Sequence, residues 1–496
     1  MLGGVAFYAV FIARASFRVA GQAAFGLFDD AMISMTYARN LAAGNGLVWM
    51  AGEAPVEGYT NLLWTLAMAL PHFAGLPDRL ASLPIQLLGA ALLAGTSALV
   101  AQLARRLAGL AVTPFLAALA TALCFPLVFW TLRGLEVGLV AFLVAAAGLL
   151  ALRLTEAPAR RDAVLLCAVL SAAVLTRTDA VAPLAVVLGF LLLQPGAPRR
   201  AAWAGGLTLA GTLLAHTGFR LLYYGSALPN TYTLKVVGHT LGERLERGVP
   251  ALLDLVVGTL WAPLALAVAL LVVRRLRLRP AEWLLAGIVA SAGAYSAYVG
   301  GDVWEFAGFA NRFVSVGLPL LFVLALLGLE ALLGALADVR THAPAALVFG
   351  LGLLLATHAG PVRDWWERGG LHVQDDEILV RQGLAIGAAM PESARVAVIW
   401  AGAIPYFSRQ PAIDLLGKSD PVIAGMAPRG EFLPGHDKWD IEYSVGRLEP
   451  DLIALGFRLP PRDLERIRAL GYEKVAQYYV RRGAPVDPRP LHAPWR

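Results

Sequence analysis

The chain has 496 residues, of which 58% are hydrophobic and only 15% are charged. A soluble protein of this length carries roughly a quarter charged residues, so the composition excludes an ordinary soluble enzyme and predicts a polytopic membrane protein. The formal net charge of +6 does not require a nucleic-acid partner, because arginines that gather at the ends of membrane helices account for it.

The N-terminal segment, residues 1–25, predicts a retained membrane helix. Its start is uncharged, and Arg14 and Arg18 interrupt the apolar run, which is unlike a cleavable signal peptide. Because the two arginines are four residues apart, they would share one face of that helix. The two cysteines, Cys124 and Cys167, lie inside apolar runs without ligand-like spacing, so neither a disulfide nor a metal site is expected.

A polar stretch, residues 28–64, follows this segment and reads FDDAMISMTYARNLAAGNGLVWMAGEAPVEGYTNLLW. It opens on two adjacent carboxylates and a short helical pattern that Gly44 and Gly46 end, and a Gly/Pro-punctuated loop follows. Its candidate site residues are Asp29, Asp30, Tyr37, Glu57, Tyr59, Asn61 and Trp64. Charged and turn-forming residues between membrane segments are costly unless they face water or a site. We therefore interpret residues 28–75 as a catalytic loop with interfacial helices.

The apolar runs predict about eleven membrane spans. After residues 1–25 they cover 81–104, 110–131, 135–154, 163–176, 180–194, 201–222, 250–273, 281–299, 313–334 and 343–360. The run 62–74 is short for a span and is broken by Pro71 and His72, so it predicts an interfacial or re-entrant helix.

The arginines in the short loops predict the orientation. They all fall on one side if the N-terminus is cytoplasmic: Arg105, Arg106, Arg160, Arg161, Arg199, Arg200, Arg274, Arg275, Arg277, Arg279 and Arg340. The opposite loops are less basic for their length, although Lys235, Arg244 and Arg247 weaken the signal. This topology brings the polar candidates to the extracytoplasmic face: Asp29, Asp30, Glu57, Glu136, Arg177, Asp179, Lys235, Asp302 and Arg312. The coincidence favours a single site on that face.

From Asp364 onward the hydropathy falls, and the pattern becomes that of a soluble domain. Helices are expected at 375–390 and 462–470, and strands at 395–400, 451–456 and 475–480. Alternating strands and helices predict a small α/β domain. The expected division is a membrane domain over 1–360 and an extracytoplasmic α/β domain over 361–496, with no GxGxxG motif for a dinucleotide.

A carboxylate pair outside the membrane suits general base catalysis, in which one Asp accepts a proton from an attacking hydroxyl while the other orients it. Nucleotide sugars do not reach that face, whereas sugars carried on polyprenyl phosphate do. Transfer from such a donor needs cations for the departing phosphate, and Lys235, Arg177 and Arg312 are the candidates.

Each candidate also has a purely structural reading. Asp30 stands where a helix N-cap is expected, and Glu136 in TLRGLEVG stands at a helix start that the macrodipole favours. The turn with Arg177 and Asp179 is either a buried polar turn or an ordinary capping turn. A solvated loop charge is the alternative for Lys235 in PNTYTLK, a motif that also contains the substrate-binding candidate Asn230, and for Asp302 in YVGGDVWEF. For His436 in PGHDKWD the alternatives are a structural role or a part of an acceptor groove.

The 28–64 stretch resembles the first-loop signature of bacterial GT-C glycosyltransferases, a group that includes the mycobacterial arabinofuranosyltransferases that cap cell-wall arabinan. The likeness continues in order through FWTLRGLEVGL, LTRTDA, YYGSALPNTYTLK, YVGGDVWEFAGFANRF, AGAIPYFSRQPAIDLLGKSD and PGHDKWD. It implies a GT-C fold, a polyprenyl-phosphate sugar donor, inversion at the sugar, and Asp29 as the base with Asp30 beside it. Departures at 178–179 and 303–304 leave the sugar and the acceptor open.

The leading hypothesis is therefore a plasma-membrane glycosyltransferase that decorates a cell-envelope glycan, lipid or protein, with arabinofuranose as one candidate sugar. The alternative is a lipid-linked sugar flippase, although such transporters spread polar groups through the bilayer midplane and often show paired repeats. The expected partners are the polyprenyl-phosphate donor, the envelope acceptor and the bilayer, without nucleic acid. We expect no cofactor; a divalent cation is compatible with such a site but not expected.

Overall fold

Helices dominate the computed structural model, which describes residues 2–194, 199–305, 311–335, 343–368, 371–456 and 459–492. Arg340 and residues 306–310 of the aromatic-rich motif lie outside the described residues. The chain divides into two units, each made of segments far apart in sequence. Unit 1 comprises Met1–Ala13, Gln86–His216 and Leu241–Arg368, and unit 2 comprises Arg14–Ile85, Thr217–Thr240 and Gly369–Arg496.

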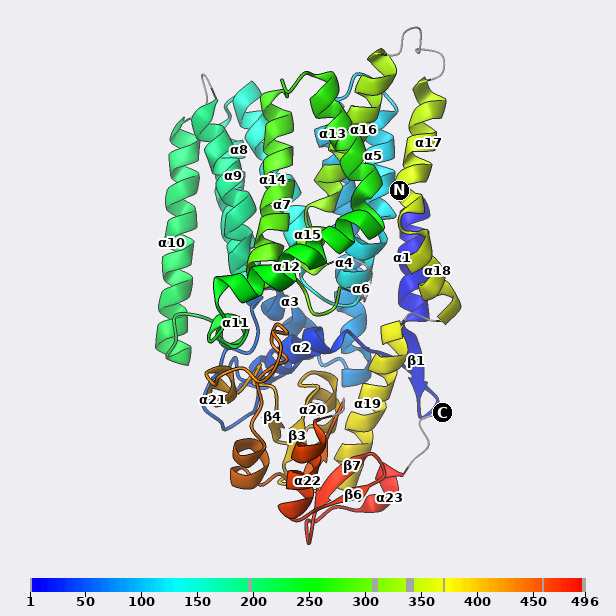
Figure 1. Cartoon of the computed structure of the whole chain (residues 1–496). Coiled ribbons are helices and arrows are strands. Elements are labelled where there is room, and N and C mark those ends of the chain that lie inside the picture. Colours follow the sequence, from blue (N-terminus) through cyan, green and yellow to red (C-terminus); the bar gives the residue numbers. More distant parts are fainter. Residues whose placement is uncertain are drawn as a thin grey trace. The chain divides into compact units, whose positions relative to one another are not determined.

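Unit 1 is a bundle of apolar helices. Its elements are α5 (Thr113–Ala122), α6 (Phe125–Leu132), α7 (Val137–Glu156), α8 (Arg160–Thr176), α9 (Val181–Leu193), α12 (Leu241–Leu255), α13 (Trp261–Val273), α14 (Pro280–Val299), α15 (Arg312–Ser315), α16 (Leu318–Ala335), α17 (Ala343–Ala356) and α18 (Ala359–Arg368). Helices α1 (Leu2–Arg14), α4 (Asp78–Leu107) and α10 (Arg199–Tyr224) belong to it in large part. Helix α13 packs against α16, α7 against α8, and α9 against α14 (Figure 1).

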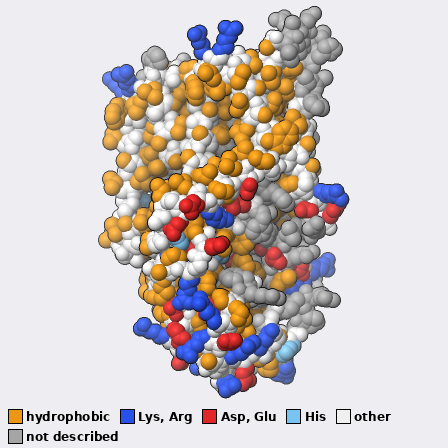
Figure 2. Space-filling view, in the orientation of Figure 1, with side chains coloured by type: hydrophobic (Ala, Val, Ile, Leu, Met, Phe, Trp, Pro, Cys, Tyr) orange, Lys and Arg blue, Asp and Glu red, His pale blue; other side chains and the backbone are white. Residues whose placement is uncertain are grey.

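The bundle has the character of a membrane domain. Among the described residues four helical stretches are long and apolar enough to cross a membrane, namely Asp78–Leu107, Val137–Glu156, Leu241–Val273 and Leu318–Ala335. A fifth is formed if α5 and α6, which meet at 45°, count as one broken span. Hydrophobic side chains cover much of the visible surface of the helical part of the molecule, as lipid-facing helices require (Figure 2). The chain is accordingly a multi-pass membrane protein, and the expected count of eleven spans is not confirmed.

The N-terminal segment differs from the single helix expected over residues 1–25. Helix α1 ends at Arg14, and strands β1 (Ser16–Val19) and β2 (Gln22–Phe25) form an antiparallel hairpin. Ala20 and Gly21 at its tip both have positive φ, 48° and 78°, which is the geometry of a tight two-residue hairpin turn. Arg18 therefore lies on a strand and does not share a helical face with Arg14.

Unit 2 combines the C-terminal α/β domain with the 28–64 stretch. Its helices are α2 (Asp29–Ala42), α3 (Leu62–Phe73), α11 (Asn230–Val236), α19 (Leu371–Ala389), α20 (Ala403–Ser408), α21 (Pro421–Ala424), α22 (Pro461–Ala469) and α23 (Pro488–Leu491). The helices expected at 62–74, 375–390 and 462–470 are thus confirmed as α3, α19 and α22. Whether α3 lies at a membrane surface stays a prediction.

A five-stranded sheet forms the core of the α/β domain, in the order β4-β3-β5-β7-β6. The strands are β3 (Val396–Val398), β4 (Ala412–Asp414), β5 (Leu452–Ala454), β6 (Tyr472–Val475) and β7 (Tyr478–Arg481). Strand β3 pairs in parallel with β4 and β5, whereas β7 runs antiparallel to β5 and β6. The sequence pattern indicated β3, β5 and β7 but missed β4 and β6. The expected strand at 475–480 in fact spans the turn of the β6–β7 hairpin.

Candidate functional site

The first carboxylate of the pair, Asp29, is the first residue of α2 and is bound to the α/β domain. Its side chain is 3% exposed, and its two oxygens accept hydrogen bonds from the backbone N–H groups of Gly402, at 3.3 Å, and Ala403, at 2.8 Å. A methyl group on Gly402 would lie 1.9 Å from the Asp29 carbonyl oxygen, so only glycine permits this approach. Asp29 thereby fixes the start of α20 against α2, and the two helices pack together (Figure 1).

The second carboxylate, Asp30, is half-buried, and its charge acts on the His436 imidazole together with the charges of Lys235 and Lys418. We call these four titratable residues, Asp30, Lys235, Lys418 and His436, the Asp30 cluster. Lys418 Nζ lies 3.5 Å from His436 Nε2, and the Lys235 side chain runs past Gly435. Burial, reinforced by the charge of Lys418, holds the pKa of His436 well below its usual value, while Asp30 opposes the shift. The imidazole is therefore neutral at physiological pH.

Lys418 was not among the residues expected at the site, and a tight turn places it there. Asp414, at the end of β4, accepts hydrogen bonds from the N–H groups of Leu416, at 3.0 Å, and Ser419, at 2.7 Å. Asn230 donates from Nδ2 to the carbonyls of Gly417, at 2.8 Å, and Lys418, at 3.0 Å. The signal was present in the sequence, because Asp414 to Lys418 reads DLLGK directly after an apolar run.

Glu57 forms a buried ion pair in unit 2. Its Oε1 and Oε2 accept hydrogen bonds from Arg220 Nε at 3.0 and 2.7 Å, and both side chains are at most 3% exposed. Burial raises the pKa of Glu57 to about 7, against the opposing charge of Arg220. The Glu57 carbonyl also accepts the N–H of Asn230 at 3.0 Å. Glu57 thus connects the first loop to α10 and α11, and Arg220 is a partner that the sequence did not indicate.

The other candidates of the first loop are buried and hydrogen-bonded within unit 2. Tyr37 donates to the Val56 carbonyl at 2.7 Å, and the Tyr59 hydroxyl lies 3.0 Å from that of Tyr224. Asn61 Oδ1 accepts from Ser34 and Thr65, both at 2.9 Å. Trp64 is 1% exposed. These contacts shape the loop, and the substrate-binding role expected for Tyr37, Tyr59, Asn61 and Trp64 stays a prediction.

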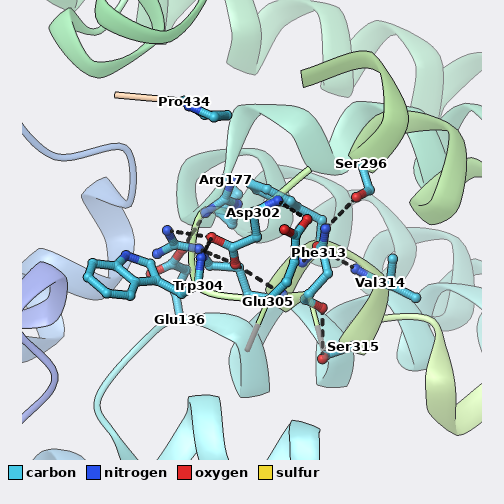
Figure 3. A network of polar contacts seen from close by, with 12 residues as sticks. Glu136, Arg177, Ser296, Asp302, Trp304, Glu305, Phe313, Val314, Ser315 and Pro434 are labelled. Atoms are coloured by element: carbon cyan, nitrogen blue, oxygen red, sulfur yellow. Dashed lines mark hydrogen bonds and ion pairs between the residues drawn. The ribbon is translucent and has the colours of Figure 1, made fainter. Parts of the chain in front are cut away.

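Unit 1 gathers the remaining candidates into a polar network among apolar helices (Figure 3). Arg177, between α8 and α9, forms two hydrogen bonds to Asp179, at 2.9 and 2.8 Å, and one to Glu136 at 2.5 Å. Glu136 stands at the N-cap position of α7. Arg312 binds both oxygens of Asp302, at 2.9 and 3.1 Å. Arg177 and Arg312 line one cavity of about 40 Å³ with apolar walls, which is room for a few water molecules.

The structure therefore brings the candidates together in two groups, one in each unit. Asp29, Asp30, Lys235 and His436 meet in unit 2, as do the first-loop residues and Asn230. Glu136, Arg177, Asp179, Asp302 and Arg312 meet in unit 1. Among the described residues no three His, Cys, Asp or Glu side chains converge as metal ligands would.

The fold formed by these helices and the small sheet domain is similar to that of two solved membrane-protein structures. The crystal structure of ArnT from Cupriavidus metallidurans in the apo state is similar over 97% of both chains, with a TM-score of 0.59 and 15% identity. ArnT from the same organism bound to undecaprenyl phosphate is similar over the same shares, with a TM-score of 0.59 and 14% identity. Residues 371–490 match the family model "Domain of unknown function (DUF8728)". No curated protein matches the sequence.

The burial of Asp29 predicts an unusual pH dependence for unit 2. Burial raises its pKa to about 6, so the folded chain binds this proton more tightly than the unfolded chain does. The free energy of unfolding contributed by Asp29 should therefore fall as the pH rises from about 4 to about 6. Chemical unfolding followed by tryptophan fluorescence, repeated at several pH values across this range, measures how steeply the free energy of unfolding falls with pH. The buried Glu57 and Asp414 also have raised pKa values and therefore contribute to this slope in the same direction.

The Asp29→Asn variant isolates the contribution of Asp29 to this slope, because the asparagine side chain cannot ionise. Its slope should be shallower than that of the unmodified chain, and an equal slope would contradict the raised pKa. At pH 7 the variant should also be less stable by about 1–3 kcal/mol, because its single amide oxygen accepts from only one of the two backbone donors, Gly402 and Ala403, and its N–H₂ group faces the other.

Proposed function

We propose that this chain is an inverting glycosyltransferase that moves a sugar from a polyprenyl-phosphate donor to a glycan, lipid or protein of the cell envelope. The reaction would take place at the extracytoplasmic face of the plasma membrane, with the N-terminus in the cytoplasm. The observation that carries the proposal is the Asp30 cluster, in which a half-buried carboxylate and two lysines act on one neutral imidazole and Lys418 Nζ lies 3.5 Å from its Nε2. The GT-C fold and the bound undecaprenyl phosphate in one ArnT structure support the choice of donor.

The cluster contains the two kinds of group that such a transfer needs. The acceptor hydroxyl oxygen attacks the anomeric carbon on the side opposite the phosphate, and a carboxylate takes the hydroxyl proton. The bond between the anomeric carbon and the phosphate oxygen breaks, and that oxygen leaves with the bonding electrons. Lysine side chains next to the site stabilise the charge on the leaving phosphate. Lys235 and Lys418 are the lysines of the cluster.

We assign the role of base to Asp30 and a positioning role to Asp29, which exchanges the two roles expected from the sequence. Both oxygens of Asp29 accept backbone hydrogen bonds, so proton transfer to Asp29 would compete with the contact that holds α20. Asp30 is the more exposed of the two, and its charge acts on His436. A base must reach the hydroxyl proton directly or through one water, which favours the more accessible carboxylate.

Arg177 and Arg312 remain proposed partners of the lipid phosphate. The walls of their common cavity are apolar, as a lipid ligand requires, but at about 40 Å³ the cavity would have to open to admit a phosphate. Each guanidinium is held by carboxylates: Asp179 and Glu136 bind Arg177, and Asp302 binds Arg312. An incoming phosphate would have to replace some of these contacts. Bidentate recognition is specific to arginine, so Arg312→Lys should weaken donor binding although it preserves the charge.

The test uses purified full-length protein and synthetic polyprenyl-phosphate sugars, with arabinofuranose first in the panel. Release of polyprenyl phosphate is followed with and without extracts of envelope glycan. Release that depends on one sugar and one acceptor is the expected result, and it also names the donor. Absence of release with every donor, together with movement of the lipid between leaflets of liposomes, would overturn the proposal in favour of a flippase.

A further inference from the structure

A second cavity, which lies in unit 2, takes no part in the chemistry proposed above. Its volume is about 220 Å³, and its lining includes no residue of the Asp30 cluster. The first loop contributes Trp49 and Glu53 to the lining, and the α/β domain contributes Arg395, Asp420 and Tyr443. The cavity thus combines aromatic rings, carboxylates and a guanidinium, which are the groups that hold polar organic ligands.

Hydrogen bonds fix the aromatic part of this cavity. Trp49 is 6% exposed, and its indole Nε1 donates to the Ala401 carbonyl at 3.1 Å. The Tyr443 hydroxyl donates to Asp420 Oδ2 at 3.2 Å. Asp420 in turn caps α21, since its Oδ1 accepts the N–H group of Val422 at 2.8 Å. These rings are held before any ligand arrives, so binding would not have to order them.

The charged pair in the lining, Arg395 and Glu53, can still form hydrogen bonds to a ligand. Arg395 Nη2 lies 3.7 Å from Glu53 Oε1, which is longer than a hydrogen bond. The other terminal nitrogen of Arg395 donates to the Leu448 carbonyl at 3.0 Å, and this bond orients the guanidinium. Both side chains are partly exposed, at 36% and 50%. A donor and an acceptor that face each other across this gap can bind a ligand group that is itself both acceptor and donor.

We propose that this cavity binds one sugar ring of the acceptor glycan, an inference that rests on the proposed function. Sugar hydroxyls donate and accept, which matches Glu53 beside Arg395, and the C–H groups of a sugar ring suit the faces of aromatic side chains. The volume lies below the roughly 300–1,000 Å³ of pockets for drug-sized ligands, so the cavity suits one ring.

The position of the cavity in the chain fits an acceptor subsite. Asp414, Ser419 and Asp420 line it, while Lys418 of the same turn belongs to the Asp30 cluster. The same backbone turn therefore contributes Lys418 to the Asp30 cluster and the next residue, Ser419, to the lining of the cavity. A glycan with one ring in the cavity would be held beside the turn that carries Lys418, with a further part of the glycan available to the cluster.

Binding is tested without any donor, on full-length protein in lipid nanodiscs. The probes are the methyl glycosides of arabinofuranose, galactofuranose and mannose, and saturation-transfer NMR measures their binding. We expect at least one of the three to bind, and Glu53→Gln and Tyr443→Phe each to weaken it by about tenfold, because each removes one hydrogen-bonding group. Both substitutions conserve shape. The matched control is Glu442→Gln, which precedes Tyr443 in the chain but pairs with Arg466.

The outcomes separate this proposal from the proposed function. Sugar binding that is lost in both variants but unchanged in the control supports the cavity, even if no donor is ever turned over. Transfer activity whose acceptor KM is unchanged in Glu53→Gln and Tyr443→Phe would overturn the cavity and leave the transferase intact. Binding of spermidine in place of every sugar would also overturn it, because it would assign the carboxylates to a cationic ligand.

Discussion

Asp30→Asn is expected to lower the rate of polyprenyl-phosphate release by about 100-fold or more, because a positioned general base contributes about 10²–10⁴-fold and an amide cannot accept the proton. Asparagine has nearly the same shape, and Asp30 is half-buried, so stability and donor binding should change little. The measurement compares the turnover number, the donor dissociation constant and the unfolding midpoint of the variant with those of the unmodified chain.

Asp29→Asn is the matched comparison, since the two residues are adjacent on α2 and carry the same group. Its main effect should be on stability, and the turnover of the molecules that remain folded should fall much less than in Asp30→Asn. If Asp29→Asn folds normally and loses all turnover while Asp30→Asn retains it, the base is Asp29. The assignment argued from the hydrogen bonds to Gly402 and Ala403 would then be wrong.

Arg220→Met is expected to destabilise unit 2 by about 3–5 kcal/mol. The substitution leaves the Glu57 carboxylate buried without its counter-charge, and removing one partner of a buried pair is far more costly than the pair itself is stabilising. Urea unfolding monitored by fluorescence, with limited proteolysis of the 28–64 stretch as a second readout, measures the loss. The loop should also become more susceptible to the protease.

A double variant makes this prediction specific. Glu57→Met combined with Arg220→Met removes both charges, and it should recover most of the stability that Arg220→Met alone loses. Arg482→Met, which breaks the exposed contact with Glu473, should leave stability unchanged. Equal losses in the single and the double variants would show that packing of the arginine stem, and not charge, accounts for the effect.

Those features that depend on local pattern could be predicted from the sequence. Apolar runs indicated the membrane helices, and the runs RVAVIW and DLIALG indicated β3 and β5. Strand β4 has only three residues and follows a proline, so its pairing with β3 cannot be inferred from periodicity. The β1–β2 hairpin was missed because its residues are apolar enough to continue α1, and only the turn at 20–21 separates them.

The candidate site shows the same limit. The residue types that gather in unit 2 were visible in the sequence, but their partners were not. Lys418 and Arg220 are distant in sequence from Asp30 and Glu57, and only the fold shows that they meet. The assignment of a positioning role to Asp29 and of the base to Asp30 also depends on the backbone N–H groups of Gly402 and Ala403. Every residue except proline has such a group, so the sequence does not indicate which ones bind Asp29.

The assembly of unit 2 from three separate segments has a consequence for biosynthesis. The 28–64 stretch is made before residues 369–496, yet these later residues supply the groups that receive Asp29 and hold the Lys418 turn. Contacts between residues so far apart in sequence form slowly. Chains with many such contacts expose hydrophobic surface and unpaired strand edges until the contacts have formed. Until the last quarter of the chain emerges, the Asp29 carboxylate has no amides to receive it. A nascent chain stalled before that point would carry the four apolar helical stretches that the structure describes as long enough to span a membrane, but not the completed Asp30 cluster.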